Sequence, residues 1–150
     1  MLAVTEDPLV PDELLKQLES SADNCGAVVS FTGKMRELGE SGKPLKSLYL
    51  EHYPVMTESS LNSIIEQAKQ RFDVATVMLS HRTGTIYKDE PIVFVGVVST
   101  HRKAAFDCAM MIMDYLKNEA PFWKKEIYVD GEEVWVKQKS TDRETYRQWQ

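Results

Sequence analysis

Residues 91–106 read PIVFVGVVSTHRKAAF, and this stretch decides the fold. Its first part, residues 91–98, contains no polar side chain and predicts a central strand of a sheet. Ser99 or Thr100 can then cap a helix that we expect over residues 100–118, with Pro121 preventing its continuation. The apolar positions of this helix are Ala105, Phe106, Ala109, Ile112, Met113 and Leu116.

The regions on either side of this stretch have equally clear patterns. A helix is expected at residues 11–20, and strands are expected at residues 27–33 and 74–80. Residues 37–47 have loop composition, and the following LKSLYLEHY alternates as a strand does. Thr57 can cap a helix over residues 58–72, whose apolar positions are Leu61, Ile64, Ile65, Ala68 and Phe72.

The C-terminal part predicts a hairpin followed by a peripheral tail. Residues 126–136, EIYVDGEEVWV, place Asp130-Gly131 as a two-residue turn between two strands. The polar tail covers residues 138–150. Helices and strands mix without a strict βαβ alternation, so we expect one α+β domain over residues 1–150, with about three helices and a mostly antiparallel sheet.

Composition narrows the classes of function. Hydrophobic residues make up 43% and charged residues 27% of the chain, which is typical of a folded globular protein. The net charge of −5 favours neither nucleic acid nor an anionic membrane as a partner. The N-terminus lacks the basic start and long apolar run of a signal peptide, so we expect a cytoplasmic protein. The two cysteines and three histidines show no metal-ligand spacing, so we expect no metal site.

Basic residues stand where a helix N-terminus normally attracts acids. His101, Arg102 and Lys103 open the helix expected at residues 100–118, although the helix dipole disfavours cations there by about 0.3–1 kcal/mol each. Solvent screening or nearby acids would explain them without any function. An anion site is the alternative, because backbone N–H groups and an arginine fork bind phosphate well. Lys117 has a structural explanation of its own, since a cation in the last turn of a helix is favourable.

Four segments together resemble a known family. GAVVSFTGKMR, LYLEHYPVMTE, HRTGTIYKDEPIVFVGVVSTHRKAAF and MDYLKNEAPFWKKE are similar to the large, catalytic subunit of molybdopterin synthase. The resemblance covers roughly residues 24–137 in the family's order. It is lost in the first 20 residues, in the loop at 37–47 and in the tail.

The resemblance implies a sulfurtransferase. Members of the family convert cyclic pyranopterin monophosphate to molybdopterin, in the biosynthesis of the molybdenum cofactor, without a bound cofactor of their own. The sulfur arrives on a small ubiquitin-like partner subunit as a C-terminal Gly-Gly thiocarboxylate. The large subunit forms a homodimer within a heterotetramer, and its α+β fold contains a hammerhead-type β element.

The family's site residues can be carried over to positions of this sequence. The resemblance implies that Lys117 and Lys124 are catalytic. It places the substrate among Lys34, Met35, Arg36, His101, Arg102, Lys117, Lys124, Lys125 and Glu126. Arg36, His101 and Arg102 would hold the phosphate and the pterin.

Lys117 and Lys124 are seven residues apart with Pro121 between them, so they do not share one helix face. The chain has to turn at NEAP, residues 118–121, and we expect this turn to bring both amines to one pocket. Repulsion between like charges there would lower the pKa of a lysine.

Two other functions fit the same residues. A non-catalytic scaffold or anion-binding protein would keep the fold, although it would be expected to lose Lys117, Lys124 or Arg102, all of which are present. A lysine Schiff-base enzyme would use Lys117 or Lys124 on a carbonyl substrate. Trapping with borohydride would distinguish this last alternative from a sulfurtransferase.

Overall fold

The computed structural model describes residues 1–137 and 140–150, which form two four-stranded sheets and four helices within these residues. The first sheet has the order β1 (Leu2–Thr5), β4 (Thr76–Arg82), β6 (Pro91–Ser99) and β2 (Ala27–Lys34). The second has the order β5 (Gly84–Ile86), β3 (Leu45–His52), β7 (Phe122–Tyr128) and β8 (Glu133–Trp135). Among these strand pairs, β1 with β4 is parallel and the rest are antiparallel, which confirms the mixed, mostly antiparallel α+β fold.

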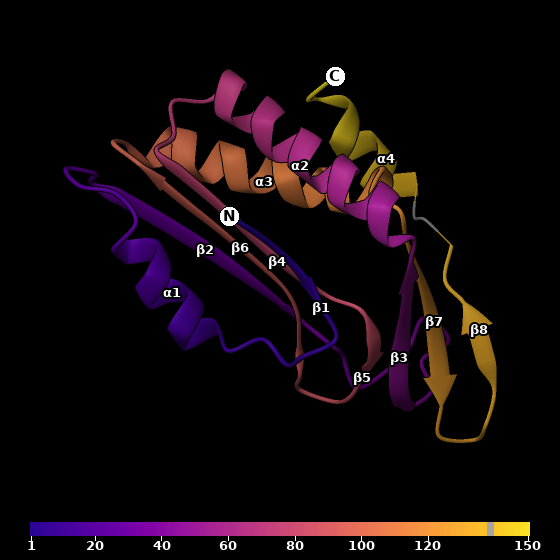
Figure 1. Ribbon diagram of the computed structural model, residues 1–150. Helices are drawn as coiled ribbons and strands as arrows, with labels where there is room; N and C mark the ends of the chain where they lie inside the picture. The colour runs from indigo at the N-terminus through magenta and orange to yellow at the C-terminus, as the bar shows by residue number, and fades with distance from the viewer. Residues whose placement is uncertain (138–139) are drawn as a thin grey trace.

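Strand β6 lies inside the first sheet, between β4 and β2, as its apolar sequence predicts. It is apolar throughout because helices cover both faces of this sheet (Figure 1). Helix α1 (Pro11–Glu19) packs on one face, where Leu18 meets Phe94 and Val98. A Cβ added to Gly96 would stand 2.5 Å from Leu18 Cδ2, so the absence of a side chain there lets α1 approach the sheet.

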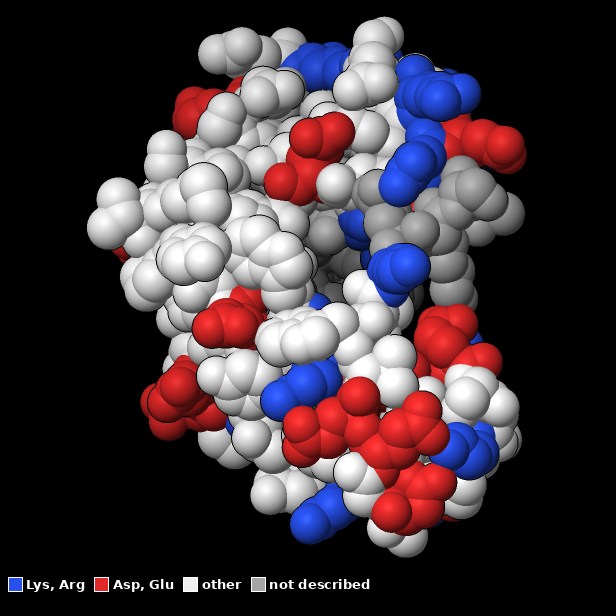
Figure 2. All heavy atoms as spheres, turned by 90° about the vertical axis from the view of Figure 1, so that its right-hand side faces the viewer, with Lys and Arg blue, Asp and Glu red and all other residues white. Residues whose placement is uncertain are grey.

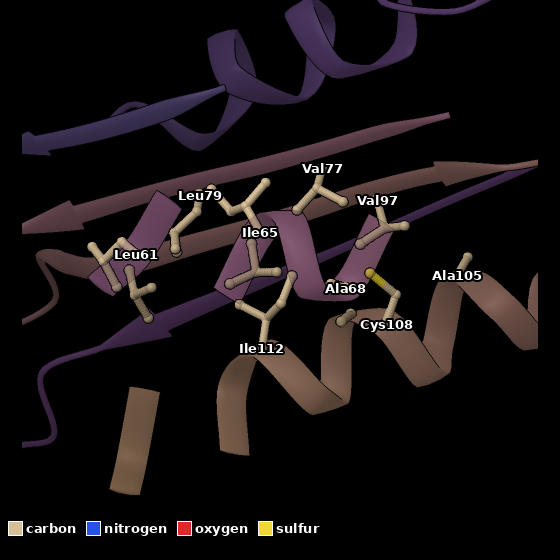
Figure 3. Close-up of a cluster of buried hydrophobic side chains, with 12 residues drawn as sticks. Leu61, Ile65, Ala68, Val77, Leu79, Val97, Ala105, Cys108 and Ile112 are labelled. Carbon is tan, nitrogen blue, oxygen red and sulfur yellow. The ribbon is translucent and has the colours of Figure 1, made fainter. Parts of the chain in front are cut away.

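Helices α2 (Pro54–Arg71) and α3 (Arg102–Asn118) cover the other face and enclose the main core (Figures 1 and 3). The buried side chains of this core come from α2, α3, β4 and β6: Leu61, Ile65, Ala68, Val77, Leu79, Val93, Val95, Val97, Ala105, Cys108, Ala109 and Ile112. The core-facing set predicted for residues 58–72 is confirmed, and Cys108 packs as a small apolar residue. This core packs α3 against the face of the first sheet.

Both long helices begin at positions other than those predicted. Helix α2 starts at Pro54, because proline already has the helical φ and lacks the N–H that the first turn leaves unbonded. Thr57 is therefore not a cap, and its hydroxyl donates to the Tyr53 carbonyl at 2.8 Å. Helix α3 starts at Arg102 with His101 as N-cap, so neither Ser99 nor Thr100 is the cap.

Phe106 is another correction. Its side chain is 62% exposed, while Ala105, one residue before it, is buried. Successive residues on a helix differ by about 100° in direction, so both cannot face the same sheet. The core takes the smaller residue, and the large ring is left on the surface.

The predicted hairpin exists with a longer turn. Gly131 donates its N–H to the Tyr128 carbonyl at 3.0 Å, and Tyr128 donates to the Glu132 carbonyl at 2.9 Å. The loop therefore contains Val129, Asp130 and Gly131, and Gly131 has a φ of +93°. This three-residue connection with a left-handed glycine replaces the predicted two-residue turn.

Strands β1 and β5 and helix α4 (Ser140–Arg147) were not predicted as elements. The tail is peripheral, as expected, but it is anchored. Trp149 donates its indole N–H to the buried carboxylate of Asp114 on α3 at 2.6 Å, and Asn118 donates its amide to the Asp142 carbonyl at 2.8 Å. Within the described residues, the helices are too short or too polar to cross a membrane.

The second sheet lies beside one end of the first (Figure 1). The hammerhead shape expected for the β element stays a prediction. Strand β3 shows the predicted alternation, with Leu48 and Leu50 buried. These side chains join Met35 and Ile86 in a small core that links the two sheets. The C-terminal end of α3 and the start of β7 lie where the two sheets meet.

Candidate active site

A cavity of about 680 Å³ lies between the second sheet, the C-terminal end of α3 and the adjoining edge of the first sheet. Figure 2 shows a hollow on this side of the molecule, with atoms of basic side chains, coloured blue, in and around it. The predicted site residues that line it are Lys34, Arg36, Lys117, Lys124 and Glu126. Its size is in the range of small-molecule sites.

Lys117 and Lys124 reach this cavity from two different elements. Helix α3 ends at Asn118, where the N–H of Glu119 donates to the Tyr115 carbonyl at 2.8 Å. The chain then reverses, and β7 begins at Phe122. This short turn brings both lysines to one cavity, as the sequence around Pro121 led us to expect.

Lys124 is the electrostatically unusual member of the pair. Burial lowers the pKa of its amine below the ordinary lysine value, and the positive charge of Lys117 lowers the pKa further. Glu126 and Glu40 act in the opposite direction, but they do not compensate. Like-charge repulsion was the predicted cause, and the structure ranks burial above it. Lys124 therefore loses its proton more readily than an ordinary lysine does.

The alternation of β7 separates Lys125 from its two neighbours. Lys124 and Glu126 point to the cavity, whereas Lys125 points to the other face of the second sheet. There its ammonium lies 5.6 Å from the Tyr49 ring centre and 5.4 Å from the Trp135 ring centre, and it pairs with Glu133 at 3.3 Å. In this chain Lys125 has a partner for its charge outside the cavity.

Glu126 holds the loop that forms one wall. Its carboxylate is only 4% exposed and accepts the backbone N–H of Glu40 through both oxygens at 3.2 Å. The Tyr128 hydroxyl donates to the same carboxylate at 2.8 Å. Because these donors occupy it, Glu126 positions the loop between β2 and β3.

The segment Lys34-Met35-Arg36 follows β2 and divides between cavity and core. Lys34 and Arg36 are exposed and line the cavity, and Arg36 pairs with Glu40 at 3.4 Å. Met35 between them is 3% exposed and packs into the core that links the two sheets. Its contribution to the site is to fix the two cations beside it.

His101 and Arg102 lie at the opposite end of α3 from Lys117. The 15 residues between Arg102 and Lys117 correspond to about 22 Å of helix at 1.5 Å per residue. Within one chain, therefore, neither residue reaches the cavity. His101 instead borders a shallower hollow with Arg71, Asp73 and Lys103.

Comparison with known proteins identifies the family of this chain. The family model described as MoaE protein matches residues 4–119. The chain belongs to the MoaE family. This confirms the resemblance drawn from the sequence segments.

Individual relatives of this MoaE-family chain are similar over nearly its full length. The molybdopterin synthase catalytic subunit of Pasteurella multocida is 44% identical over 148 residues, which are 99% of this chain and 97% of the relative. The MoaE protein structure from Burkholderia ambifaria has a TM-score of 0.83 at 36% identity and covers 99% of this chain and 97% of its own. The structure of molybdopterin synthase from Staphylococcus aureus has a TM-score of 0.81 at 28% identity, with 90% and 96% covered. The expectation of an enzyme subunit is thereby confirmed.

His81 is a cavity residue that was not among the predicted site residues. It directly follows the strand predicted at residues 74–80, and in this MoaE-family chain it lines the same cavity as the two lysines. No spacing in the sequence marks it, because its neighbours in the cavity come from α3 and β7. Among the described residues, no group of three or more His, Cys, Asp and Glu is arranged to hold a metal ion.

Proposed function

We propose that this chain is the sulfurtransferase subunit that converts cyclic pyranopterin monophosphate to molybdopterin, taking sulfur from the C-terminal thiocarboxylate of a small partner subunit. The observation that carries the proposal is the convergence of Lys117 and Lys124, with Lys34 and Arg36, on one cavity of about 680 Å³. With Lys137, five basic side chains line this hollow, and they suit a phosphorylated substrate and an anionic sulfur donor. The names of the relatives support the same activity.

The two central lysines have different environments and so different roles. Lys117 lies at the exposed end of α3, where a charged amine orients an incoming thiocarboxylate. Lys124 is half-buried with a lowered pKa, so its amine is suited to moving protons or attacking an acyl group beside the pterin. Lys34 at the end of β2 and Arg36 just after it line the same cavity and are suited to bind the phosphate.

The sulfur donor enters from outside in this proposal. The cavity opens to the surface (Figure 2), and its rim carries exposed apolar side chains, Met56 at 47% and Trp123 at 44%. Neither cysteine of the chain lines the cavity, so the sulfur has to come from another molecule. The term catalytic subunit in the names of relatives likewise implies an enzyme with a second kind of chain. Two unpaired cysteines are typical of a reducing compartment, and we place the reaction in the cytoplasm.

A homodimer is the second part of the proposal, and it decides the roles of His101 and Arg102. Because neither reaches the cavity of its own chain, a second copy has to supply them if they bind substrate. Strand β2 is an edge strand next to α3 and exposes Phe31, and α3 exposes Phe106 and Met110. Large exposed apolar side chains of this kind favour burial against another chain.

Reconstitution tests the proposal directly. The purified chain, a small partner carrying a C-terminal thiocarboxylate, and the pyranopterin should together yield a dithiolene product. The same partner with an ordinary carboxylate is the matched control and should yield none. A wild-type chain that stays folded and makes no dithiolene with the charged partner would overturn the proposal.

A lysine Schiff-base enzyme is the second candidate, because the lowered pKa of Lys124 is also what such an enzyme needs. In that case borohydride should link a carbonyl substrate covalently to the wild-type chain and not to Lys124→Ala. Trapped adducts together with absent sulfur transfer would favour this alternative.

A further inference from the structure

The imidazole of His81 is a fixed group in the wall of the cavity. His81 is the second-to-last residue of β4, opposite Val93 of the central strand, and is only 7% exposed. Its ring stacks on Phe122 with the centroids 4.0 Å apart and the planes 12° from parallel. Phe122 begins β7 two residues before Lys124, so His81 and the catalytic lysines share one cavity.

The hydrogen bonds of the ring determine its tautomer. Nδ1 lies 2.8 Å from the backbone carbonyl oxygen of Arg82, and a carbonyl only accepts, so Nδ1 carries the proton. In the neutral ring, Nε2 is then an acceptor. Burial lowers the pKa of His81 to about 4, with Lys117 and His52 contributing in the same direction, so the ring is neutral near pH 7.

Nε2 has no hydrogen-bond partner among the described residues. The buried side-chain atom that lacks a partner in the described part of the chain is Arg82 Nε, and not a nitrogen of His81. Nε2 is therefore reached from the cavity that His81 lines. An acceptor in a nearly buried residue, held by stacking and by one hydrogen bond, is prepared for a donor that is not part of this chain.

The other charged side chains of the cavity leave a role for a neutral acceptor. Lys34, Arg36, Lys117 and Lys137 only donate when charged, and they suit the phosphate and the thiocarboxylate. The amine of Lys124 is already assigned to proton transfer or acyl attack. The carboxylates of Glu40, Glu119 and Asp142 also line the cavity, but a negative charge repels a phosphorylated ligand. A pterin ring system carries N–H groups, which need an acceptor when water is excluded.

We propose that Nε2 of His81 accepts a hydrogen bond from an N–H group of the pterin ring system and so orients the substrate against Lys117 and Lys124. This inference rests on the proposed function and adds a specificity-determining residue to it. His81 binds substrate through an acceptor, whereas the lysines and Arg36 bind it through charge. Loss of this acceptor is expected to weaken binding of the pyranopterin and to leave binding of inorganic phosphate unchanged.

Two substitutions of His81 separate its two nitrogens. The amide of His81→Asn can still donate to the Arg82 carbonyl but presents nothing at the position of Nε2. The longer His81→Gln can place its amide oxygen near that position. We expect affinity for the pyranopterin, measured by titration calorimetry, to fall about tenfold in His81→Asn and less in His81→Gln. Inorganic phosphate should bind equally to both variants and to the wild type, and thermal unfolding shows whether each is folded.

A measurement on the wild-type chain removes the dependence on folded variants. With ¹⁵N-labelled histidine, the Nε2 resonance of His81 should show an unprotonated nitrogen and should shift when the pyranopterin binds, but not when phosphate binds. Pyranopterin binding with an unmoved Nε2 resonance, or wild-type affinity in a folded His81→Asn, overturns this inference alone. Failure of the wild-type chain to bind the pyranopterin overturns the proposed function and this inference together.

Discussion

The two ends of α3 both carry basic residues, yet they differ in their relation to the helix dipole and in whether they line the cavity. At the N-terminal end His101, Arg102 and Lys103 are exposed and oppose the helix dipole. At the C-terminal end Lys117 is where the dipole favours a cation, and it is there that the chain forms a cavity. The conflict with the dipole is thus a poor guide to the position of the cavity.

The surroundings of each end explain the contrast. Lys103 has an 87% exposed side chain and pairs with Asp107 one turn later at 2.6 Å, so solvent and a nearby acid account for it. Lys124 is enclosed by the second sheet and by α3, which lowers its pKa. The pKa of a charged group shifts when the fold removes water from around it. For Lys124 this burial comes from elements that are far apart in the sequence.

The largest expected effect lies at the cavity end. Lys117→Ala should reduce single-turnover sulfur transfer by about a hundredfold or more while leaving affinity for the pyranopterin largely intact, since its charge orients the donor. Lys124→Ala should impair both. Lys117→Arg should not restore full activity, because a guanidinium is wider and keeps its proton.

The matched control for these variants is Lys16→Ala. Lys16 is an exposed lysine on α1, which covers the face of the first sheet that is opposite to α3 (Figure 1). Its loss should change neither sulfur transfer nor affinity for the pyranopterin. Near-normal transfer in a folded Lys117→Ala would remove the role given to Lys117. Full activity in Lys117→Arg would show that any cation at this position orients the donor and that the shape of the ammonium does not matter.

The sequence predicted those parts of the molecule that depend on local pattern. The central strand at 91–98, the apolar face of the helix at 58–72 and the turn that joins Lys117 to Lys124 all follow from spacing within a few residues. The short strands β1 and β5 carry too few residues for a pattern, and they form because a neighbouring strand pairs with them.

The site was less predictable for the same reason. The resemblance supplied the lysines and Arg36, and the helix predicted over residues 100–118 already implied that Arg102 and Lys117 lie at opposite ends. The sequence did not show that β7 begins at Phe122 and turns Lys125 away from the cavity. His81 acquires its neighbours only when β4, β7 and α3 come together. Contacts between distant segments determine these features, and a local pattern does not record them.

The next effect tests whether the N-terminal end of α3 takes part in the site. Arg102→Ala should lower affinity for the pyranopterin about tenfold, through loss of a charge-assisted contact that a second chain provides. Lys103→Ala, which removes the adjacent cation paired with Asp107, is the control and should have no such effect. Calorimetry at protein concentrations where the dimer persists provides the measurement, and unchanged affinity would exclude Arg102 from the phosphate site.

A smaller effect should appear in stability rather than activity. Burial, followed by the charge of Lys117, lowers the pKa of Lys124, so the folded chain holds this proton less tightly than the unfolded chain does. At a pH below the lowered pKa, the charged amine of Lys124 therefore reduces the free energy of unfolding by its full amount. This reduction disappears as the pH rises from the lowered pKa toward about 10.4, the ordinary lysine value. Lys124→Met should therefore unfold at a higher temperature than wild type near pH 7, by a margin that shrinks at alkaline pH.

Lys103→Met is the control at the other end of the helix. Because this amine is exposed, the difference in unfolding temperature between Lys103→Met and wild type should not shrink at alkaline pH. A margin for Lys124→Met that stays constant from pH 7 to about pH 10 would contradict the assignment of a buried, depressed amine to Lys124.

The smallest effect on activity is expected between the two ends, at Cys108 in the middle of α3. Its thiol is fully buried and burial raises its pKa to about 12, so it is inert as a nucleophile. Cys25 is half-buried, and its thiol donates to the Asp23 carbonyl at 3.4 Å. A Cys25→Ser/Cys108→Ala double variant should keep most of its sulfur-transfer activity and lose about 1 kcal/mol of stability, chiefly from the small cavity left at Cys108. Turnover lost in the folded double variant would mean that a thiol of this chain carries sulfur. Turnover retained would leave α3 as the rigid support that holds one cationic end in the cavity and presents the other to a second chain.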